Sequence, residues 1–285
     1  MESRPTLRAM RRAELDTLVD WAAAEGWNPG LDDAAIFWDT DSEGFIAAER
    51  DGELIGGGSI VAYSGRFGFM GFFIVRPEHR GRGLGRRLWL HRRDRLLARL
   101  GSPATIGMDG VFAMQDFYAR GGFVLSHRDL RFEGRGAASP SAAGLVDVRE
   151  VPFEALTSFD AAHFPAPRER FLAAWIAQPH GRGLAAMRDG AMRGYGVIRR
   201  CRQGYKIGPL FADTATTADA LYRGLSGLVP GEAVFLDVPE NNPQALALAR
   251  RHAMREVFGC ARMYHGAPPA LPHRQIYGVT TFELG

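Results

Sequence analysis

A short loop that alternates glycine with arginine has the composition of an anion-binding site. It follows an apolar run at residues 72–75 and precedes a sequence typical of an amphipathic helix. Glycines at 81, 83 and 85 let the backbone turn its N–H groups toward a bound anion without interference from side chains. The start of the helix adds free N–H donors and the positive end of its dipole. Because arginines flank these glycines, the pattern predicts a cradle for a diphosphate.

Two common diphosphate-binding loops are excluded by their own patterns. A Walker loop needs a lysine followed by serine or threonine, but the single lysine of this chain, Lys206, precedes Ile207. A dinucleotide loop needs G-x-G-x-x-G, and counting from Gly81 and Gly83 the third position holds Arg86. A simpler alternative is a glycine-rich turn that caps an arginine-rich helix, since arginine replaces lysine throughout the chain.

The loop resembles the R-x-x-G-x-G signature of the GNAT superfamily of N-acetyltransferases. Arg80, Gly83 and Gly85 occupy the signature positions, and Val75 and Pro77 lie upstream as in that family. The resemblance implies that acetyl-coenzyme A (acetyl-CoA) binds here, with its pyrophosphate in the loop. The residues expected to hold the pyrophosphate are Arg80, Gly81, Arg82, Gly83, Leu84, Gly85 and Arg86.

The same resemblance implies a place for the pantetheine arm of the coenzyme. The backbone groups of Phe73, Ile74 and Val75 are expected to face it. Splaying of the strands beyond this point would open the slot that the arm enters.

A candidate general acid lies downstream of the loop. Residues 118–123 read Y-A-R-G-G-F, which resembles the Y-x-x-x-G-F element of the family, whose tyrosine lies near the coenzyme sulfur. A phenol with a pKa of about 10 stays protonated at neutral pH and can donate to the departing thiolate. Tyr118 is therefore predicted to be catalytic; the alternative is a ring that packs beneath the sheet. The asparagine that often opens this helix in the family is Val111 here.

The general base is harder to locate. The strand predicted at residues 67–75 carries no acid, although many family members use a glutamate there. Asp109, at the end of the next strand, is the nearest candidate. Asp237 occupies the matching point of the second half, which favours a shared structural role, and an ordered water chain would need no side chain.

Residues that line the acceptor site are expected just after the first helix. Trp27 and Asn28 occupy that position, where the family often places such residues. For Trp27 a role as a core side chain is an equal alternative.

Composition excludes several classes of function. With 285 residues and a net charge of only +3, charge alone does not indicate nucleic-acid binding. The histidines and the two cysteines lack metal-ligand spacing, so no metal is predicted. The polar N-terminal residues and the lack of long apolar runs predict a protein that does not bind membranes and lies in the cytoplasm with reduced thiols.

Hydrophobic periodicity predicts the elements that position these groups, and it predicts them twice. The first half is expected to contain a helix at residues 15–22, a hairpin across 51–52, a strand at 67–75, a helix to about 100, a strand at 104–111, a helix at 114–120 and a strand at 123–132. The second half repeats the order, with helices at 153–164 and 168–178, a hairpin across 189–190, a strand at 205–211, a helix at 216–228, a strand at 233–238, a helix at 242–252 and a strand at 256–264.

These elements predict an α/β protein with two GNAT-like acetyltransferase domains. Each domain is expected to have a mixed, mostly antiparallel sheet flanked by helices. The predicted bounds are residues 1–133 for a catalytic domain, 134–144 for a linker of small residues, and 145–285 for a second domain.

The second domain is predicted to be degenerate. Residues 212–217 replace the loop, lack glycine and carry Asp213, which would repel a diphosphate. Ala249 stands where the tyrosine would be. This half is expected to pack against the first and to shape the acceptor pocket.

The predicted function is transfer of an acetyl group from acetyl-CoA to a small primary amine by direct attack in a ternary complex. The alternatives are another acyl-CoA or acceptor, or a non-catalytic protein that senses acetyl-CoA and binds a partner. The oligomeric state is left open.

Overall fold

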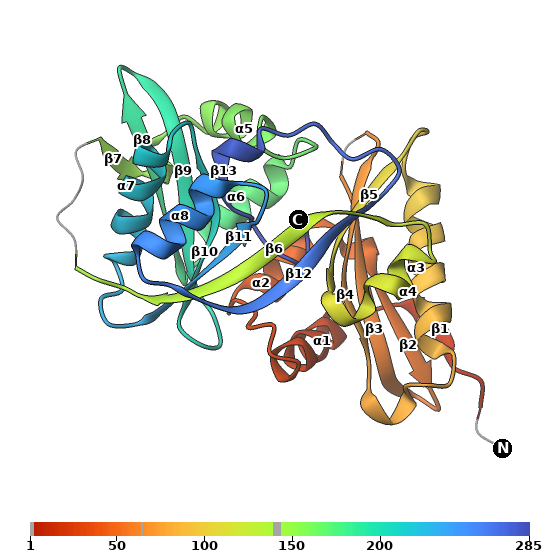
Figure 1. The fold of residues 1–285 in the computed structure, drawn as a ribbon. Coiled ribbons are helices and arrows are strands. Elements are labelled where there is room, and N and C mark those ends of the chain that lie inside the picture. Colours follow the sequence, from red (N-terminus) through yellow and green to blue (C-terminus); the bar gives the residue numbers. More distant parts are fainter. Residues whose placement is uncertain (1–2, 64, 139–143) are drawn as a thin grey trace.

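The computed structural model describes residues 3–63, 65–138 and 144–285. Its strands form one continuous sheet with helices packed on its faces (Figure 1). The elements of the first half are β1 (Thr6–Ala9), α1 (Arg12–Ala24), α2 (Asp33–Thr40), β2 (Phe45–Arg50), β3 (Glu53–Ala62), β4 (Phe67–Val75), α3 (Leu84–Arg99), β5 (Thr105–Val111), α4 (Gln115–Ala119) and β6 (Val124–Arg135). Those of the second half are β7 (Leu145–Asp147), α5 (Phe153–Ala161), α6 (Glu169–Ala177), β8 (Gly181–Arg188), β9 (Ala191–Arg200), β10 (Tyr205–Ala212), α7 (Ala215–Ser226), β11 (Ala233–Pro239), α8 (Pro243–Arg251), β12 (Arg255–His265) and β13 (Ile276–Gly278).

The predicted elements are present because their local signals are strong. In α1 the apolar residues recur on one face, and Leu15, Leu18 and Ala22 are fully buried. In the β2–β3 turn both Asp51 and Gly52 have positive φ, as a two-residue hairpin turn requires. The sequence patterns did not predict α2 or the three short strands β1, β7 and β13.

The two expected sheets are one sheet because the halves exchange their last strands. The strand order is β1-β2-β3-β4-β5-β12-β6-β11-β10-β9-β8-β7, with β13 beside β10. Thus β12 pairs with β5 of the first half, and β6 pairs with β11 of the second. The two exchanged strands also pair with each other, antiparallel, along the middle of the molecule.

Because of this exchange, the predicted boundary between the domains falls inside a shared sheet. The domain bounds stay a prediction. Strand β6 extends to Arg135, so the first two residues of the expected linker belong to the sheet. Residues 139–143 of that linker lie outside the described residues.

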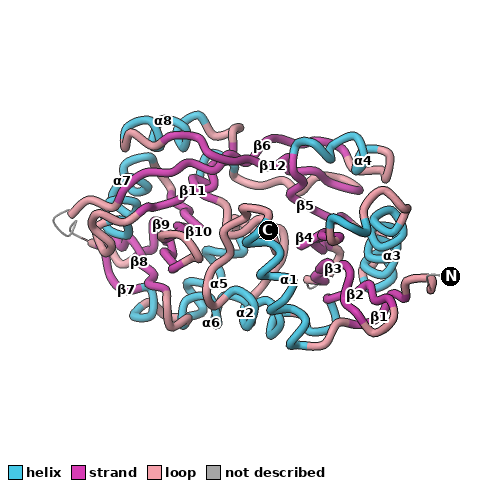
Figure 2. The backbone as a smooth tube through the Cα atoms, turned by 90° about the horizontal axis from the view of Figure 1, so that it is seen from below, coloured by secondary structure: helices cyan, strands magenta, loops and turns pink. Residues whose placement is uncertain are grey.

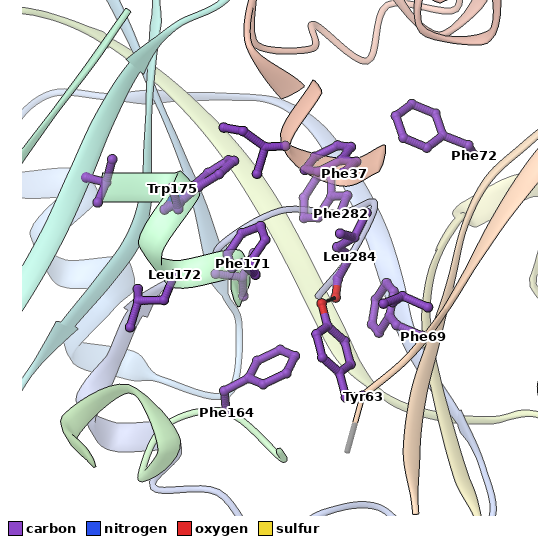
Figure 3. Packing of buried hydrophobic residues seen from close by; sticks show 14 of the residues in the cluster. Phe37, Tyr63, Phe69, Phe72, Phe164, Phe171, Leu172, Trp175, Phe282 and Leu284 are labelled. Atoms are coloured by element: carbon purple, nitrogen blue, oxygen red, sulfur yellow. Dashed lines mark hydrogen bonds between the residues drawn. The ribbon is translucent and has the colours of Figure 1, made fainter. Parts of the chain in front are cut away.

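An apolar core joins the two halves. Phe37 on α2 stacks on Trp175 on α6, with ring centroids 6.3 Å apart, and Phe171 stacks on the same indole at 4.9 Å (Figure 3). Phe282 and Leu284, near the C-terminal end, pack into this cluster. No helix within the described ranges is long and apolar enough to cross a membrane.

Candidate active site

Strand β4 carries a bulge at the point where it separates from β5. Its parallel pairing with β5 ends at Met70 opposite Met108. On the other edge, Ser59 pairs with Gly71 but Gly57 pairs with Ile74, so two residues of β4 face one residue of β3. The backbone of β4 beyond the bulge therefore has an edge that β5 does not cover, as the predicted slot requires.

A buried arginine holds this bulge in place. One guanidinium nitrogen of Arg92, on α3, donates hydrogen bonds to the carbonyl oxygens of Ser59 and Gly71. These are the two residues that pair just before the register shifts. The bulge is thus tied directly to the helix that follows the glycine-rich loop.

The glycine-rich loop leads into α3 as expected for an anion cradle. Gly81 and Gly83 have φ of +75° and +82°, and Gly83 is the residue that precedes the first turn of α3. A Cβ at either glycine would meet no atom within 4 Å, so the space beside the loop is open. The N–H groups of the first helical turn lack partners within the helix and are available to an anion.

Arg80 is held at the mouth of the site. Its Nε donates to the carbonyl oxygen of Val75 at 2.7 Å, and its guanidinium forms an ion pair with Glu25 at the end of α1. This arrangement links the loop to the end of β4 and to the first helix.

A cavity of about 450 Å³ brings many of the predicted residues together. The loop, the end of β4, α4 and the end of α1 all contribute to its wall. The predicted residues that line it are Trp27, Phe73, Ile74, Val75, Arg80, Gly81, Gly85, Asp109 and Tyr118. Those that are not among its lining residues are Asn28, Arg82, Gly83, Leu84 and Arg86.

The ring of Tyr118 is buried in the wall of this cavity. It lies against the backbone of Gly110, where a Cβ would be 2.4 Å from a ring carbon, so only glycine fits there. Phe73 and Trp89 surround the ring at centroid distances of 6.4 and 6.2 Å. Burial raises the pKa of Tyr118 above its ordinary value, and the hydroxyl therefore stays protonated at neutral pH.

Asp109 lines the cavity but is held by an arginine. Its two carboxylate oxygens accept hydrogen bonds of 2.6 and 2.7 Å from Arg262 on β12. The same guanidinium lies 3.4 Å from Asp129 on β6. Burial raises the pKa of Asp109, and Arg262 opposes that rise. Because both oxygens already accept from Arg262, Asp109 is less available as a base than its position suggests; its catalytic role stays a prediction.

Trp27 and Asn28 lie side by side in the chain but have different surroundings. Trp27 lines the cavity. The side-chain amide of Asn28 exchanges two hydrogen bonds of 2.9 Å with the backbone of Gln203. The backbone carbonyl oxygen of Asn28 accepts from Lys206 Nζ at 3.0 Å. Asn28 therefore joins the two halves, and its role in acceptor binding stays a prediction.

Sequence reasoning missed the residues that the second half adds to the cavity. These are Phe258 and Cys260 on β12, and Phe282 and Glu283 near the C-terminal end. No local pattern marks them, because they reach the cavity only through the strand exchange and the course of the C-terminal segment. The expectation that the second half shapes this pocket agrees with their positions.

The corresponding slot of the second half is filled by the chain itself. Strands β10 and β11 are parallel and separate after Ile207, as β4 and β5 do after Met70. Strand β13 pairs with β10 beyond that point, and the N–H of Val279 donates to the carbonyl oxygen of Asp237 on β11 at 2.9 Å. A backbone segment thus fills the opening between β10 and β11 that corresponds to the opening between β4 and β5.

Comparison with known families agrees with this fold. A family model described as "Acetyltransferase (GNAT) family" matches residues 9–123, and one described as "Acetyltransferase (GNAT) domain" matches residues 156–278. Together the two models match most of the chain, one for each half. The protein belongs to the GNAT superfamily and has a tandem arrangement of two GNAT domains.

Individual relatives share the architecture over nearly the whole chain. The chain is 28% identical to a holothin acyltransferase of a Pseudoalteromonas species over 274 residues, which cover 95% of this chain and 92% of that protein. Among solved structures, a proposed acetyltransferase from Pyrococcus horikoshii superposes with a TM-score of 0.85 at 23% identity, covering 99% of this chain and 96% of the other. A tandem GNAT protein from the clavulanic acid biosynthesis pathway superposes with a TM-score of 0.63 at 16% identity, covering 94% and 100%. The family and the acyltransferase relative support acyl transfer as the general activity.

Proposed function

We propose that this protein is an acetyl-CoA-dependent N-acetyltransferase with one working site, in its first half. The observation that carries the proposal is the single cavity in which the glycine-rich loop, the uncovered edge of β4 and Tyr118 meet. The three parts correspond to the pyrophosphate, the pantetheine arm and the departing sulfur of the donor.

The residues fit the donor in charge and shape. The N-terminus of α3 and the arginines of residues 80–86 suit a diphosphate. The β4 edge at Phe73, Ile74 and Val75 offers backbone groups to an amide-containing arm. Tyr118, kept protonated by burial, gives the leaving thiolate a proton as the C–S bond breaks.

The second half is proposed to be non-catalytic. Its loop begins with Asp213, which accepts a hydrogen bond from Thr217 and would repel a phosphate. Strand β13 fills the slot between β10 and β11. We infer that this half acts by completing the wall of the working cavity.

The acceptor is proposed to be a small molecule with a primary amine. Side chains from both halves line the cavity, and most of them are apolar, including Phe72, Phe258 and Phe282. A mostly apolar cavity of about 450 Å³ suits a compact acceptor, which we propose in preference to a lysine on a folded protein. The similarity to a holothin acyltransferase makes holothin a rational member of any acceptor panel.

The test is release of coenzyme A thiol from acetyl-CoA in the presence of an amine panel that includes holothin, with propionyl-CoA as a second donor. We expect turnover that depends on the amine and a rise in melting temperature with acetyl-CoA alone. Binding of acetyl-CoA without turnover on any amine would favour the sensor alternative. Preference for propionyl-CoA would correct the donor while leaving the acyl transfer in place.

A further inference from the structure

Glu283 is a buried acid that the proposed mechanism has not used. The residue is only 3% exposed, and it lines the same cavity as Tyr118. Its Oε2 atom is shielded from solvent and has no hydrogen-bond partner within the described residues. A buried carboxylate oxygen without a partner costs free energy, so it is a candidate for a functional group.

The C-terminal segment places this residue against β4. A Cβ added to Gly71 would lie 2.1 Å from the carbonyl oxygen of Glu283, so the segment packs directly on this glycine. Gly71 is the residue at which the β4 bulge begins and the pairing with β5 has just ended. The backbone of Glu283 thus lies against the part of β4 that itself carries no acid, and the residue lines the cavity there.

Hydrogen bonds fix the segment on both sides of Glu283. The hydroxyl of Tyr63 donates to the carbonyl oxygen of Leu284 at 2.8 Å. Thr281 Oγ1 accepts from the N–H groups of Glu283 at 3.2 Å and Leu284 at 2.9 Å. The backbone that carries the carboxylate is therefore held in one position.

Glu283 and Tyr118 approach β4 from opposite faces of the sheet. The C-terminal end lies on the side of α1 and α2, whereas α3 and α4 lie on the other side (Figure 2). The core clusters agree: Phe282 and Leu284 pack with α1 and α2, and Tyr118 packs with α3. Glu283 and Tyr118 therefore line the same cavity from opposite faces of the sheet.

The charges around Glu283 come from four elements. Lys206 on β10, Arg199 on β9 and Arg131 on β6 favour its charged form, and Asp33 on α2 opposes it. Arg199 already pairs with Asp33, and Arg131 pairs with Asp237. Lys206 Nζ donates to the backbone carbonyl oxygen of Asn28 and is the charge that most favours the ionised Glu283, although burial lowers the pKa of Lys206 itself. Burial raises the pKa of Glu283 above its ordinary value.

We propose that Glu283 is the general base that activates the acceptor amine, an inference that rests on the proposed acetyltransferase function. The amine nitrogen forms a bond to the thioester carbonyl carbon, and its surplus proton passes to the Glu283 carboxylate. The carbon–sulfur bond then breaks, and the thiolate takes a proton from the Tyr118 hydroxyl. The two side chains exchange protons with solvent before the next turnover.

The principal test is Glu283→Gln, which keeps the size of the side chain and removes the basic oxygen. We expect kcat to fall by about 10²-fold or more with KM for acetyl-CoA unchanged. The acidic limb of the kcat/KM profile should disappear. Asp109→Asn is the matched comparison, and it should keep that limb.

A second variant, Lys206→Met, tests the Glu283 carboxylate without changing Glu283 itself. Removal of this cation raises the pKa of Glu283, because Lys206 favours the charged carboxylate. The acidic limb of the profile should therefore move to higher pH. The pKa of Asp109 should not change in this variant, because the charges that act on it are those of Arg262 and Asp129.

The possible outcomes distinguish an error in the assignment of Glu283 as the base from an error in the proposed acetyltransferase function. Wild-type turnover with full activity of Glu283→Gln, or loss of the acidic limb in Asp109→Asn alone, would overturn Glu283 and keep the acetyltransferase. An inactive wild type would overturn both. A folded Glu283→Gln variant should keep the rise in melting temperature with acetyl-CoA. If the variant loses both this rise and its activity, the loss of activity comes from misfolding.

Discussion

Tyr118 is the residue proposed to give the departing thiolate its proton, and its surroundings fit both a catalytic and a structural role. Its neighbours Phe73 and Trp89 exclude water from the ring, and Gly110 leaves room for it. The same burial that could mark a purely structural tyrosine also keeps its hydroxyl protonated. A catalytic Tyr118 needs its hydroxyl, whereas a purely structural one needs only its ring. Removal of the hydroxyl alone therefore distinguishes the two roles.

Tyr118→Phe should lower kcat by about 10²-fold while leaving KM and the acetyl-CoA-induced rise in melting temperature unchanged. The ring still fills its place, so only the proton donor is lost. Steady-state kinetics check this result. Tyr277→Phe is the control, because its hydroxyl bonds Gln244 in the second half and should not affect turnover. Full activity of Tyr118→Phe would remove it as general acid.

At the scale of elements, the loop and α3 together form the proposed binding site for the diphosphate of the donor. Gly83 has φ of +82° and Gly190, in the β8–β9 turn, has φ of +73°; a Cβ at either meets nothing within 4 Å. Valine at either position is strained by its backbone alone. Comparing the two valine variants therefore distinguishes the effect of backbone strain from an effect on ligand binding.

Gly83→Val should abolish most of the acetyl-CoA-induced rise in melting temperature, because the N–H groups of the loop can no longer converge on the diphosphate. Gly190→Val should lose a similar amount of basal stability, on the order of 1–3 kcal/mol, but keep the rise. Thermal unfolding with and without acetyl-CoA measures both. An equal rise in the two variants would contradict the placement of the diphosphate.

The N-terminus of α1 provides a pH-dependent contribution to stability. Glu14 accepts hydrogen bonds from the Arg8 side chain on β1 and from the Arg11 backbone N–H. Chiefly because of Arg8, the pKa of Glu14 falls from 4.5 to about 2. The carboxylate therefore stabilises the fold above pH 4.5, and this contribution is lost as the pH falls toward 2.

Glu14→Gln should lower the free energy of unfolding at pH 7 by about 1–3 kcal/mol. The difference from wild type should shrink at pH 3, since part of the wild-type contribution is lost there. Urea unfolding at the two pH values checks the prediction. Asp16→Asn, in an exposed pair with Arg12 on the same helix, should change little at either pH. A difference that stays constant between pH 7 and pH 3 would contradict the role of Glu14.

At the scale of the whole molecule, the two halves are joined by strands, an apolar core and ion pairs. The pair between Asp33 on α2 and Arg199 on β9 is buried, with side-chain exposures of 0% and 1%. A second pair across the same junction, Asp20 with Arg202, is 61% and 48% exposed. Both pairs carry the same charges, so their comparison isolates the effect of burial.

Asp33→Asn should lower the free energy of unfolding by about 3–5 kcal/mol, because it leaves Arg199 buried without its charged partner. Asp20→Asn should cost less than about 1 kcal/mol, since water screens that pair. Chemical unfolding of both variants provides the measurement. Equal effects would mean that the junction is open to solvent.

The sequence by itself determined the local parts of this protein. The glycine-rich loop, the helix after it, the tyrosine at 118 and the duplicated order of elements all depend on residues close together in the chain, and the family resemblance follows from them. Hydrophobic periodicity located the long elements for the same reason. Short strands such as β1 and β13 lack enough residues to show a period.

Tertiary structure alone decided which half supplies each wall of the site. The exchange of β6 and β12, the filling of the second slot by β13 and the approach of Glu283 to Gly71 join residues far apart in sequence. Asp109 meets Arg262 only because β12 crosses into the first half. Such contacts leave no local pattern, because either pairing of the last strands satisfies the same alternation of side chains.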